Sequence, residues 1–189
     1  MWGMRKIFLT LLFLLPMLGM AQEYDFAKRI GDNTIYFYIT STGGKNGATV
    51  EVTFPNTEEE PWRGYHKPSG QVAIPEKVTP DRATGRNADP EDDDTTIYTV
   101  TAVRYNAFLD CDRITRLTLP STIKKIGENA FGGCRRVAYI VSEAQEPPKL
   151  DESSFDKVDL DIPVRVPTGS YEAYHAAIGW RQFTEIIEY

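Results

Sequence analysis

A few short motifs contain residue types that could do chemistry. Ser121 and Lys124 have the Ser-x-x-Lys spacing with which acyl-transfer enzymes activate a serine nucleophile. No Lys-Thr-Gly partner exists in the chain, and the pair directly follows a Leu-x-Leu-Pro segment that ends at Pro120. The sequence therefore favours a structural turn here over a catalytic serine.

Two other motifs are weaker. The segment Gly43-Gly44-Lys45-Asn46 lacks the glycine spacing of a phosphate-binding loop and the Ser or Thr that follows its lysine, so it predicts a hairpin turn. The two histidines, His66 and His175, lie in unlike segments, and no set of ligands with metal-binding spacing surrounds either. We predict no catalytic residue, no cofactor site and no metal site.

The acidic run Glu91-Asp92-Asp93-Asp94 has two interpretations. Hard cations such as Ca²⁺ take carboxylate oxygens, so the run could hold calcium outside the cell. The Asp-x-Asp-x-Asp-Gly order of a calcium loop is absent, however, and a solvated loop is favoured.

The strongest signal in the chain is an internal repeat. Residues 100–117 align with residues 123–140 at an offset of 23, and the apolar anchors of the first copy meet apolar anchors of the second, as in Val103 with Ile126 and Leu117 with Ile140. Residues that recur unchanged at this offset include the pairs Asn106 and Asn129, Ala107 and Ala130, Phe108 and Phe131, and Cys111 and Cys134. An apolar-x-apolar-Pro form recurs at Val72-x-Ile74-Pro75, Leu117-x-Leu119-Pro120 and Val164-x-Val166-Pro167, and Phe155 follows Phe131 by nearly one period.

Such a repeat is one coil of a solenoid. The alternation in Leu117-x-Leu119 predicts a short strand with two inward side chains, and the apolar spacing from Ile123 to Cys134 predicts a tight helical or 3₁₀ return. One coil cannot bury its apolar face alone, so coils must stack and atypical ends must close the stack. Residues 79–97, rich in Pro, Gly and acidic residues, predict a loop inserted into one coil.

The two cysteines occupy the same inward position of successive coils. Stacked coils place equivalent residues about 5 Å apart, a separation that permits a disulfide. Parallel Cβ directions make the required dihedral angle awkward, however. We therefore favour two buried thiols at Cys111 and Cys134 over a bridge.

The repeat resembles the BspA-like leucine-rich repeat family of exported bacterial surface proteins. The similarity rests on two segments and a closing one, which read Asn106-Ala107-Phe108-x-x-Cys111-x-x-Ile114, Leu117-x-Leu119-Pro120-x-x-Ile123-x-x-Ile126-Gly127-x-x-Ala130-Phe131-x-x-Cys134, and Val166-Pro167-x-Gly169-Ser170-x-x-x-Tyr174 with Trp180-x-x-Phe183. Arg104 departs from the pattern, because the second copy has Gly127 at this position. The resemblance implies an α/β repeat, a short right-handed leucine-rich-repeat-type solenoid used in adhesion or recognition, and it brings no catalytic residues.

Both ends of the predicted solenoid, residues 70–167, have candidate caps. Residues 22–69 form a β-rich N-terminal segment in which runs at 34–39 and 48–54 predict a β-hairpin. Residues 168–189 predict a helical C-terminal cap, in which Ser170 caps a helix and Gly179 ends it.

The first residues of the chain have the features of a secretory signal peptide. Arg5 and Lys6 precede an apolar run, and small residues stand at Gly19 and Ala21, which predicts a signal peptide over residues 1–21 rather than a buried helix. Cleavage would leave 19 basic residues against 27 acidic ones, a net charge of −8. Such a protein has no electrostatic reason to bind nucleic acid or anionic lipid, and no second apolar run predicts membrane insertion.

The outward positions of the strands predict a candidate binding surface. When the copies are aligned by the two inward-pointing residues of each strand, their outward side chains become neighbours on one sheet face. Those of most interest are Arg116, Tyr139, Val141 and Arg165. A tyrosine flanked by arginines is typical of recognition hot spots, but an ordinary surface cation–π pair explains the same residues.

Two classes of function remain open. The first is an exported, non-catalytic binding or adhesion module that recognises an unidentified protein or glycan. The second is a structural or assembly component of the bacterial cell envelope. Nothing in the sequence favours a hydrolase, because the polar residues of the repeats alternate with core positions and do not converge.

Overall fold

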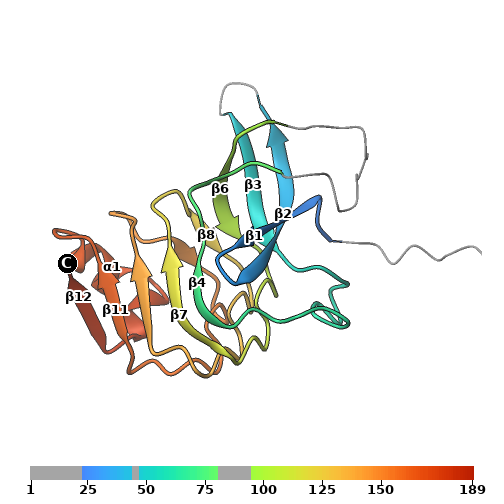
Figure 1. Cartoon of the computed structure of the whole chain (residues 1–189). Coiled ribbons are helices and arrows are strands. Elements are labelled where there is room, and N and C mark those ends of the chain that lie inside the picture. Colours follow the sequence, from blue (N-terminus) through green and yellow to red (C-terminus); the bar gives the residue numbers. More distant parts are fainter. Residues whose placement is uncertain (1–22, 44–46, 81–94) are drawn as a thin grey trace, which may run out of the picture.

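The computed structural model describes residues 23–43, 47–80 and 95–189. The predicted signal peptide, the acidic run at 91–94 and most of the glycine-rich motif at 43–46 lie outside these residues. The described chain forms two sheets joined by turns, with helical segments only near the C-terminus (Figure 1).

A five-stranded parallel sheet contains the predicted repeat strands. Its order is β12-β11-β9-β7-β4, and the strands are β4 (Gly70–Ala73), β7 (Ile114–Leu119), β9 (Tyr139–Ser142), β11 (Pro163–Val166) and β12 (Glu185–Glu188). Leu117 is in register with Val72 on one side and Ile140 on the other, and Ile140 is in register with Val164. All four side chains are buried, which confirms the predicted repeat register.

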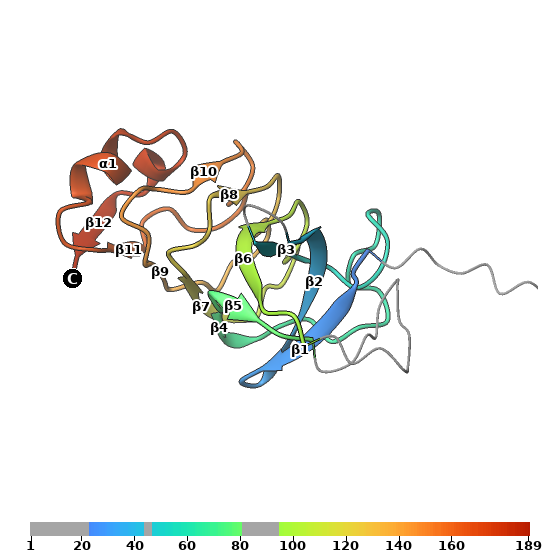
Figure 2. The same cartoon turned by 90° about the horizontal axis from the view of Figure 1, so that it is seen from above.

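The second sheet combines the N-terminal segment with the opposite sides of the coils. Its order is β1-β2-β3-β6-β8-β10, with β5 also paired to β6, and the strands are β1 (Phe26–Ile30), β2 (Asn33–Thr42), β3 (Ala48–Thr53), β5 (Lys77–Val78), β6 (Tyr98–Val103), β8 (Lys125–Ile126) and β10 (Lys149–Leu150). The predicted hairpin is the antiparallel pair β2 and β3. Because β3 also pairs in parallel with β6, the hairpin extends this sheet (Figure 2).

The return segments of the coils are successive turns, which differs from the predicted helical or 3₁₀ return. In the second copy, backbone N–H groups bond three residues back at Ala130, Gly132, Cys134 and Val137. The backbone has positive φ at Asn106 and Asp110, and again at their counterparts Asn129 and Gly133. A left-handed residue stops a helix from propagating, and Asn, Asp and Gly tolerate that conformation best. The recurring Asn therefore sets turn geometry.

A stack of aromatic rings forms the centre of the core. The Phe108 and Phe131 rings lie 5.2 Å apart with an interplanar angle of 4°, and Phe131 and Phe155 lie 5.3 Å apart at 10°. Trp180 and Phe183 then close the stack against Phe155. Phe108 and Phe131 are 1% and 0% exposed, which confirms that they are buried equivalents in adjacent coils.

Both cysteines are free and buried, as we expected. The Cys134 thiol donates a hydrogen bond to the Phe108 carbonyl at 3.3 Å. Burial raises the pKa of both thiols, that of Cys134 to about 12. Neither group is therefore a thiolate at neutral pH.

The C-terminal segment contains α1 (Tyr171–Ala176) and the 3₁₀ helix η1 (Trp180–Gln182). Ser170 precedes α1, but the prediction that its side chain caps the helix is wrong, because its hydroxyl donates to the Pro167 carbonyl instead. The Glu188 carboxylate accepts from the backbone N–H groups of Gly169 and Tyr171, at 2.9 and 2.8 Å. A negative charge at a helix start is favourable, and β12 supplies it.

The side chain of Asn33 joins the N-terminal hairpin to the first repeat strand. Its amide nitrogen donates to the carbonyls of Ser69 and Gln71, both at 3.1 Å, and its oxygen accepts from the Ser69 N–H at 2.9 Å. Asn33 is buried, and these bonds satisfy backbone groups beside the edge strand β4. The Asn33 amide thus replaces the neighbouring strand that β4 lacks on this side.

Candidate functional site

The structure brings the predicted surface residues together on the outer face of the five-stranded sheet. Arg116 on β7 is in register with Tyr139 on β9, and Val141 on β9 is in register with Arg165 on β11. Arg116, Tyr139 and Val141 are half-buried, and Arg165 is exposed. The strand alternation predicted from the sequence therefore places all four residues on one face.

Tyr139 contacts both arginines. The guanidinium carbon of Arg116 lies 4.4 Å from the centre of the Tyr139 ring, and that of Arg165 lies 5.2 Å from it. Arg116 also donates from Nη1 to the Gln71 Oε1 atom at 3.0 Å. Side chains from four adjacent strands thus form one continuous row across the sheet.

This row holds its central groups in place while leaving donors for a ligand. The cation–π contacts, worth about 0.5–1 kcal/mol each at exposed sites, fix the plane of the Tyr139 ring. The exposed Arg165 guanidinium can donate to a ligand, whereas Arg116 Nε is buried and out of a ligand's reach. An ordered aromatic ring between two guanidinium groups can contact apolar surface and donate to acidic or carbonyl oxygens.

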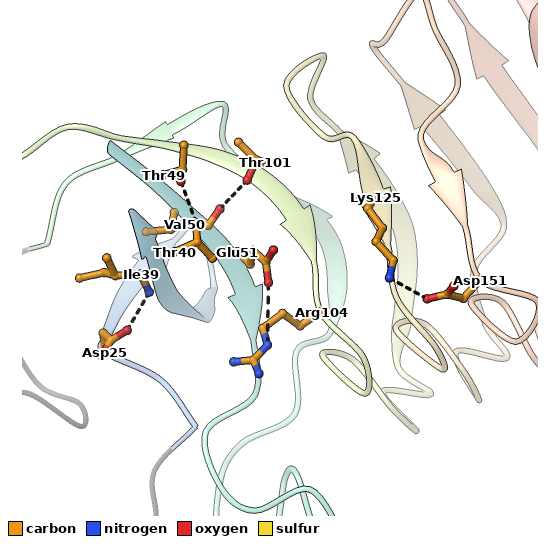
Figure 3. A network of polar contacts seen from close by, with 10 residues as sticks. All are labelled: Asp25, Ile39, Thr40, Thr49, Val50, Glu51, Thr101, Arg104, Lys125 and Asp151. Carbon is orange, nitrogen blue, oxygen red and sulfur yellow. Dashed lines mark hydrogen bonds and ion pairs between the residues drawn. The ribbon is translucent and has the colours of Figure 1, made fainter. Parts of the chain in front are cut away.

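A cavity of about 430 Å³ on the second sheet was not anticipated from the sequence. Figure 3 shows two pairs that line it: Glu51 with Arg104, at 3.9 Å, and Lys125 with Asp151, at 3.3 Å. The Arg104 guanidinium carbon also lies 4.1 Å from the centre of the Tyr38 ring. Arg104 is therefore held by the hairpin as well as by its own coil.

The departure of Arg104 from the repeat was the one sequence signal of this cavity. At the equivalent Gly127, a Cβ atom would lie 2.6 Å from the Tyr105 backbone nitrogen, so the coil stacked there leaves no space for a side chain. Arg104 lies next to β3, since its N–H bonds to the Val52 carbonyl. The position therefore tolerates a side chain only in the first copy.

The remaining candidate groups do not converge. Within the described ranges, no three His, Cys, Asp or Glu residues are grouped as metal ligands. Ser121 donates to Glu76, and Lys124 donates to the Ser121 carbonyl, so that lysine is not placed to activate the hydroxyl. His66 and His175 lie on exposed segments at different ends of the structure. In the part of the chain that is described, no helix has the length and apolar character to cross a membrane.

Known proteins share this architecture. The family model for a BspA type leucine rich repeat region (6 copies) matches residues 95–168. A solved leucine-rich repeat protein from Bacteroides capillosus superposes with a TM-score of 0.52 at 20% identity, covering 86% of this chain and 98% of that one. No protein with curated functional information matches the sequence.

Two further solved structures are more distant. A leucine rich cell surface protein from Faecalibacterium prausnitzii has a TM-score of 0.44 at 17% identity, over 76% of this chain and 37% of that one. A leucine-rich repeat protein from Bacteroides ovatus has a TM-score of 0.42 at 22% identity, over 75% of this chain and 36% of that one. The chain thus spans little more than a third of these two proteins.

The stacked coils and the superposition define a leucine-rich repeat fold. Residues 95–168 match the model of the BspA type leucine rich repeat region.

Proposed function

We propose that this chain is an exported, non-catalytic binding module, and that it recognises a protein or a glycan with the outer face of the five-stranded sheet. One observation carries the proposal: Tyr139 lies between two arginines that approach its ring to 4.4 and 5.2 Å. Tyrosine and arginine are the residue types enriched where recognition energy concentrates. Val141 adds apolar surface beside them.

The fold supports a binding role over catalysis. Repeats of this family occur typically in surface and binding proteins, and leucine-rich repeat domains are generally non-catalytic. Parallel strands place outward side chains at regular intervals, so that each coil contributes one or two contacts to a shared face. A ligand that spans several strands would contact the row from Gln71 to Arg165.

The proposed location is outside the cytoplasm. The basic residues, apolar run and small residues of positions 1–21 support export, and proteins with these repeats are generally surface-exposed or exported. The excess of acidic residues supports a protein or glycan partner over nucleic acid.

A parallel screen of two proteins tests the proposal. The chain without residues 1–21 and its Tyr139→Ala variant are applied to a glycan array and used to capture host and bacterial surface proteins. We expect at least one ligand that binds the first protein and is lost or strongly weakened with the variant. If every ligand binds both proteins equally, the outer face is not the binding surface.

The alternative function, a structural or assembly component of the envelope, is favoured by one specific feature. Large apolar side chains are exposed near the C-terminal end of the solenoid: Ile178 at 72%, Ile187 at 40% and Tyr189 at 57%. Light scattering of the chain without residues 1–21 separates the two functions. A stable oligomer that dissociates when Ile178 and Ile187 become serine would favour assembly, and a monomer would favour the binding module.

A further inference from the structure

A second cavity, of about 390 Å³, lies where three segments distant in the sequence meet. Arg29 comes from β1, His66 and Lys67 from the segment that precedes β4, and Arg113 from the residue before β7. Its other polar lining includes Asp32 and the hydroxyl groups of three further residues: Thr34, Tyr36 and Ser69. The cavity is separate from the row formed by Arg116, Tyr139 and Arg165.

The charge of this cavity is opposite to that of the whole chain. Arg29, Lys67 and Arg113 are cationic at neutral pH and only Asp32 is anionic, whereas the chain has a net charge of −6. No carboxylate of the described residues forms an ion pair with any of the three cations. Three cations against one carboxylate leave the cavity lining with an excess of positive charge, which favours an anion.

Hydrogen bonds hold the cavity walls in a fixed arrangement. The Asn33 amide bonds three times to the backbone of residues 69 and 71, and the Gly70 N–H donates to the Arg113 carbonyl at 2.9 Å. The Lys67 ammonium donates to the Asp110 carbonyl at 2.9 Å. These bonds fix the backbone that surrounds the cavity, so little backbone order has to be gained on binding, which favours affinity.

Aromatic rings line the cavity beside the cations. Tyr65 is half-buried, and its ring lies 5.8 Å from that of the buried Tyr36 at an angle of 85°. An edge-to-face pair fixes the plane of the partly exposed ring. A fixed tyrosine face beside hydroxyl groups can pack against a sugar ring, while arginine donates two hydrogen bonds to one carboxylate or sulfate.

We propose that this cavity binds the anionic group of an acidic saccharide, a sugar that carries a carboxylate or a sulfate. Arg29 and Arg113 pair with the anion, and Tyr65 packs against the sugar ring. The cavity is independent of the outer face of the five-stranded sheet, so either site can fail its test without affecting the other.

Calorimetric titration of the chain without residues 1–21 tests the proposal with four probes. They are a galacturonic acid tetrasaccharide, a sulfated disaccharide, neutral cellotetraose and a tetraglutamate peptide. We expect one or both acidic saccharides to bind, more weakly as NaCl rises from about 50 to about 500 mM because salt screens exposed charges. The saccharide that binds identifies the anion as carboxylate or sulfate.

Matched variants assign the binding to this cavity. Arg29→Gln with Arg113→Gln is expected to reduce affinity at least tenfold, and Tyr65→Ala to reduce it by a smaller factor. Arg136→Gln removes another exposed arginine, one coil further along, and is expected to leave affinity unchanged. The proposal is overturned if neither acidic saccharide binds, if cellotetraose or tetraglutamate binds equally well, or if the Arg136 variant loses as much affinity as the double variant.

Discussion

The hydroxyl groups of Ser142 and Tyr174 lie 2.7 Å apart in the core, where both residues are fully buried. Ser142 occupies an inward strand position that is Leu119 on the neighbouring strand, and Tyr174 comes from α1. The Tyr174 hydroxyl also bonds to the Ala144 carbonyl at 2.9 Å. This polar contact joins the C-terminal helix to the repeats.

Removal of the Tyr174 hydroxyl should therefore destabilise the protein. Tyr174→Phe leaves the Ser142 hydroxyl and the Ala144 carbonyl buried without this partner, which costs about 1–3 kcal/mol in the free energy of unfolding. Urea denaturation measures this change. Tyr171→Phe, on the exposed side of the same helix, is the control, and an equal effect of both changes would contradict the role of the contact.

The stacked phenylalanines provide a test of the core. Phe131→Ala removes the middle ring of the stack and should lower the free energy of unfolding by about 3–5 kcal/mol, the usual cost of emptying a core aromatic site. Thermal and urea denaturation measure it. A loss below about 1 kcal/mol would be incompatible with a ring that is 0% exposed.

The two thiols should react only after unfolding. Because burial raises the pKa of Cys111 and Cys134, alkylation of the folded protein at pH 8 should be slow. Unfolding without a reductant should make both thiols accessible, and mass spectrometry should find two alkyl groups. A mass lower by two hydrogens with no alkylation would show that a disulfide forms instead.

The Asn33 side chain should stabilise the junction between the hairpin and β4. Asn33→Ala leaves backbone groups of residues 69 and 71 without their partners, and we expect a loss of at least about 2 kcal/mol in the free energy of unfolding. Hydrogen exchange should show faster exchange of the Ser69 amide. Thr34→Ala is a neighbouring control, and unchanged protection at Ser69 in the Asn33 variant would refute the proposed role.

Local periodicity was sufficient to predict the repeat. The apolar positions of Leu117 and Phe131 recur with the spacing of one coil, and period-2 alternation alone places Arg116 and Tyr139 outward. Apolar spacing alone predicts a helical return. The positive φ that Asn106 and Asn129 adopt stops such a helix, so the return is a series of turns.

Long-range contacts could not be predicted in this way. Ser170 precedes a helix and is a preferred capping residue, yet Glu188, which follows it by 18 positions, accepts the bonds. The cavity lined by Arg29 and Arg113 requires β1 to pack beside the first coil, and no period in the sequence relates those two segments. Only the tertiary arrangement brings these side chains together.

The central claim is tested most directly by measuring how tightly two variants bind a ligand that the screen has identified. Arg116→Ala and Tyr139→Ala should each weaken binding at least tenfold, because they remove groups that contact the ligand, while Tm changes little since neither side chain belongs to the core. Arg136→Ala, an exposed arginine away from the row, should leave the Kd unchanged. Unaltered Kd values in both variants would contradict the assignment of the binding surface to the outer face of the five-stranded sheet.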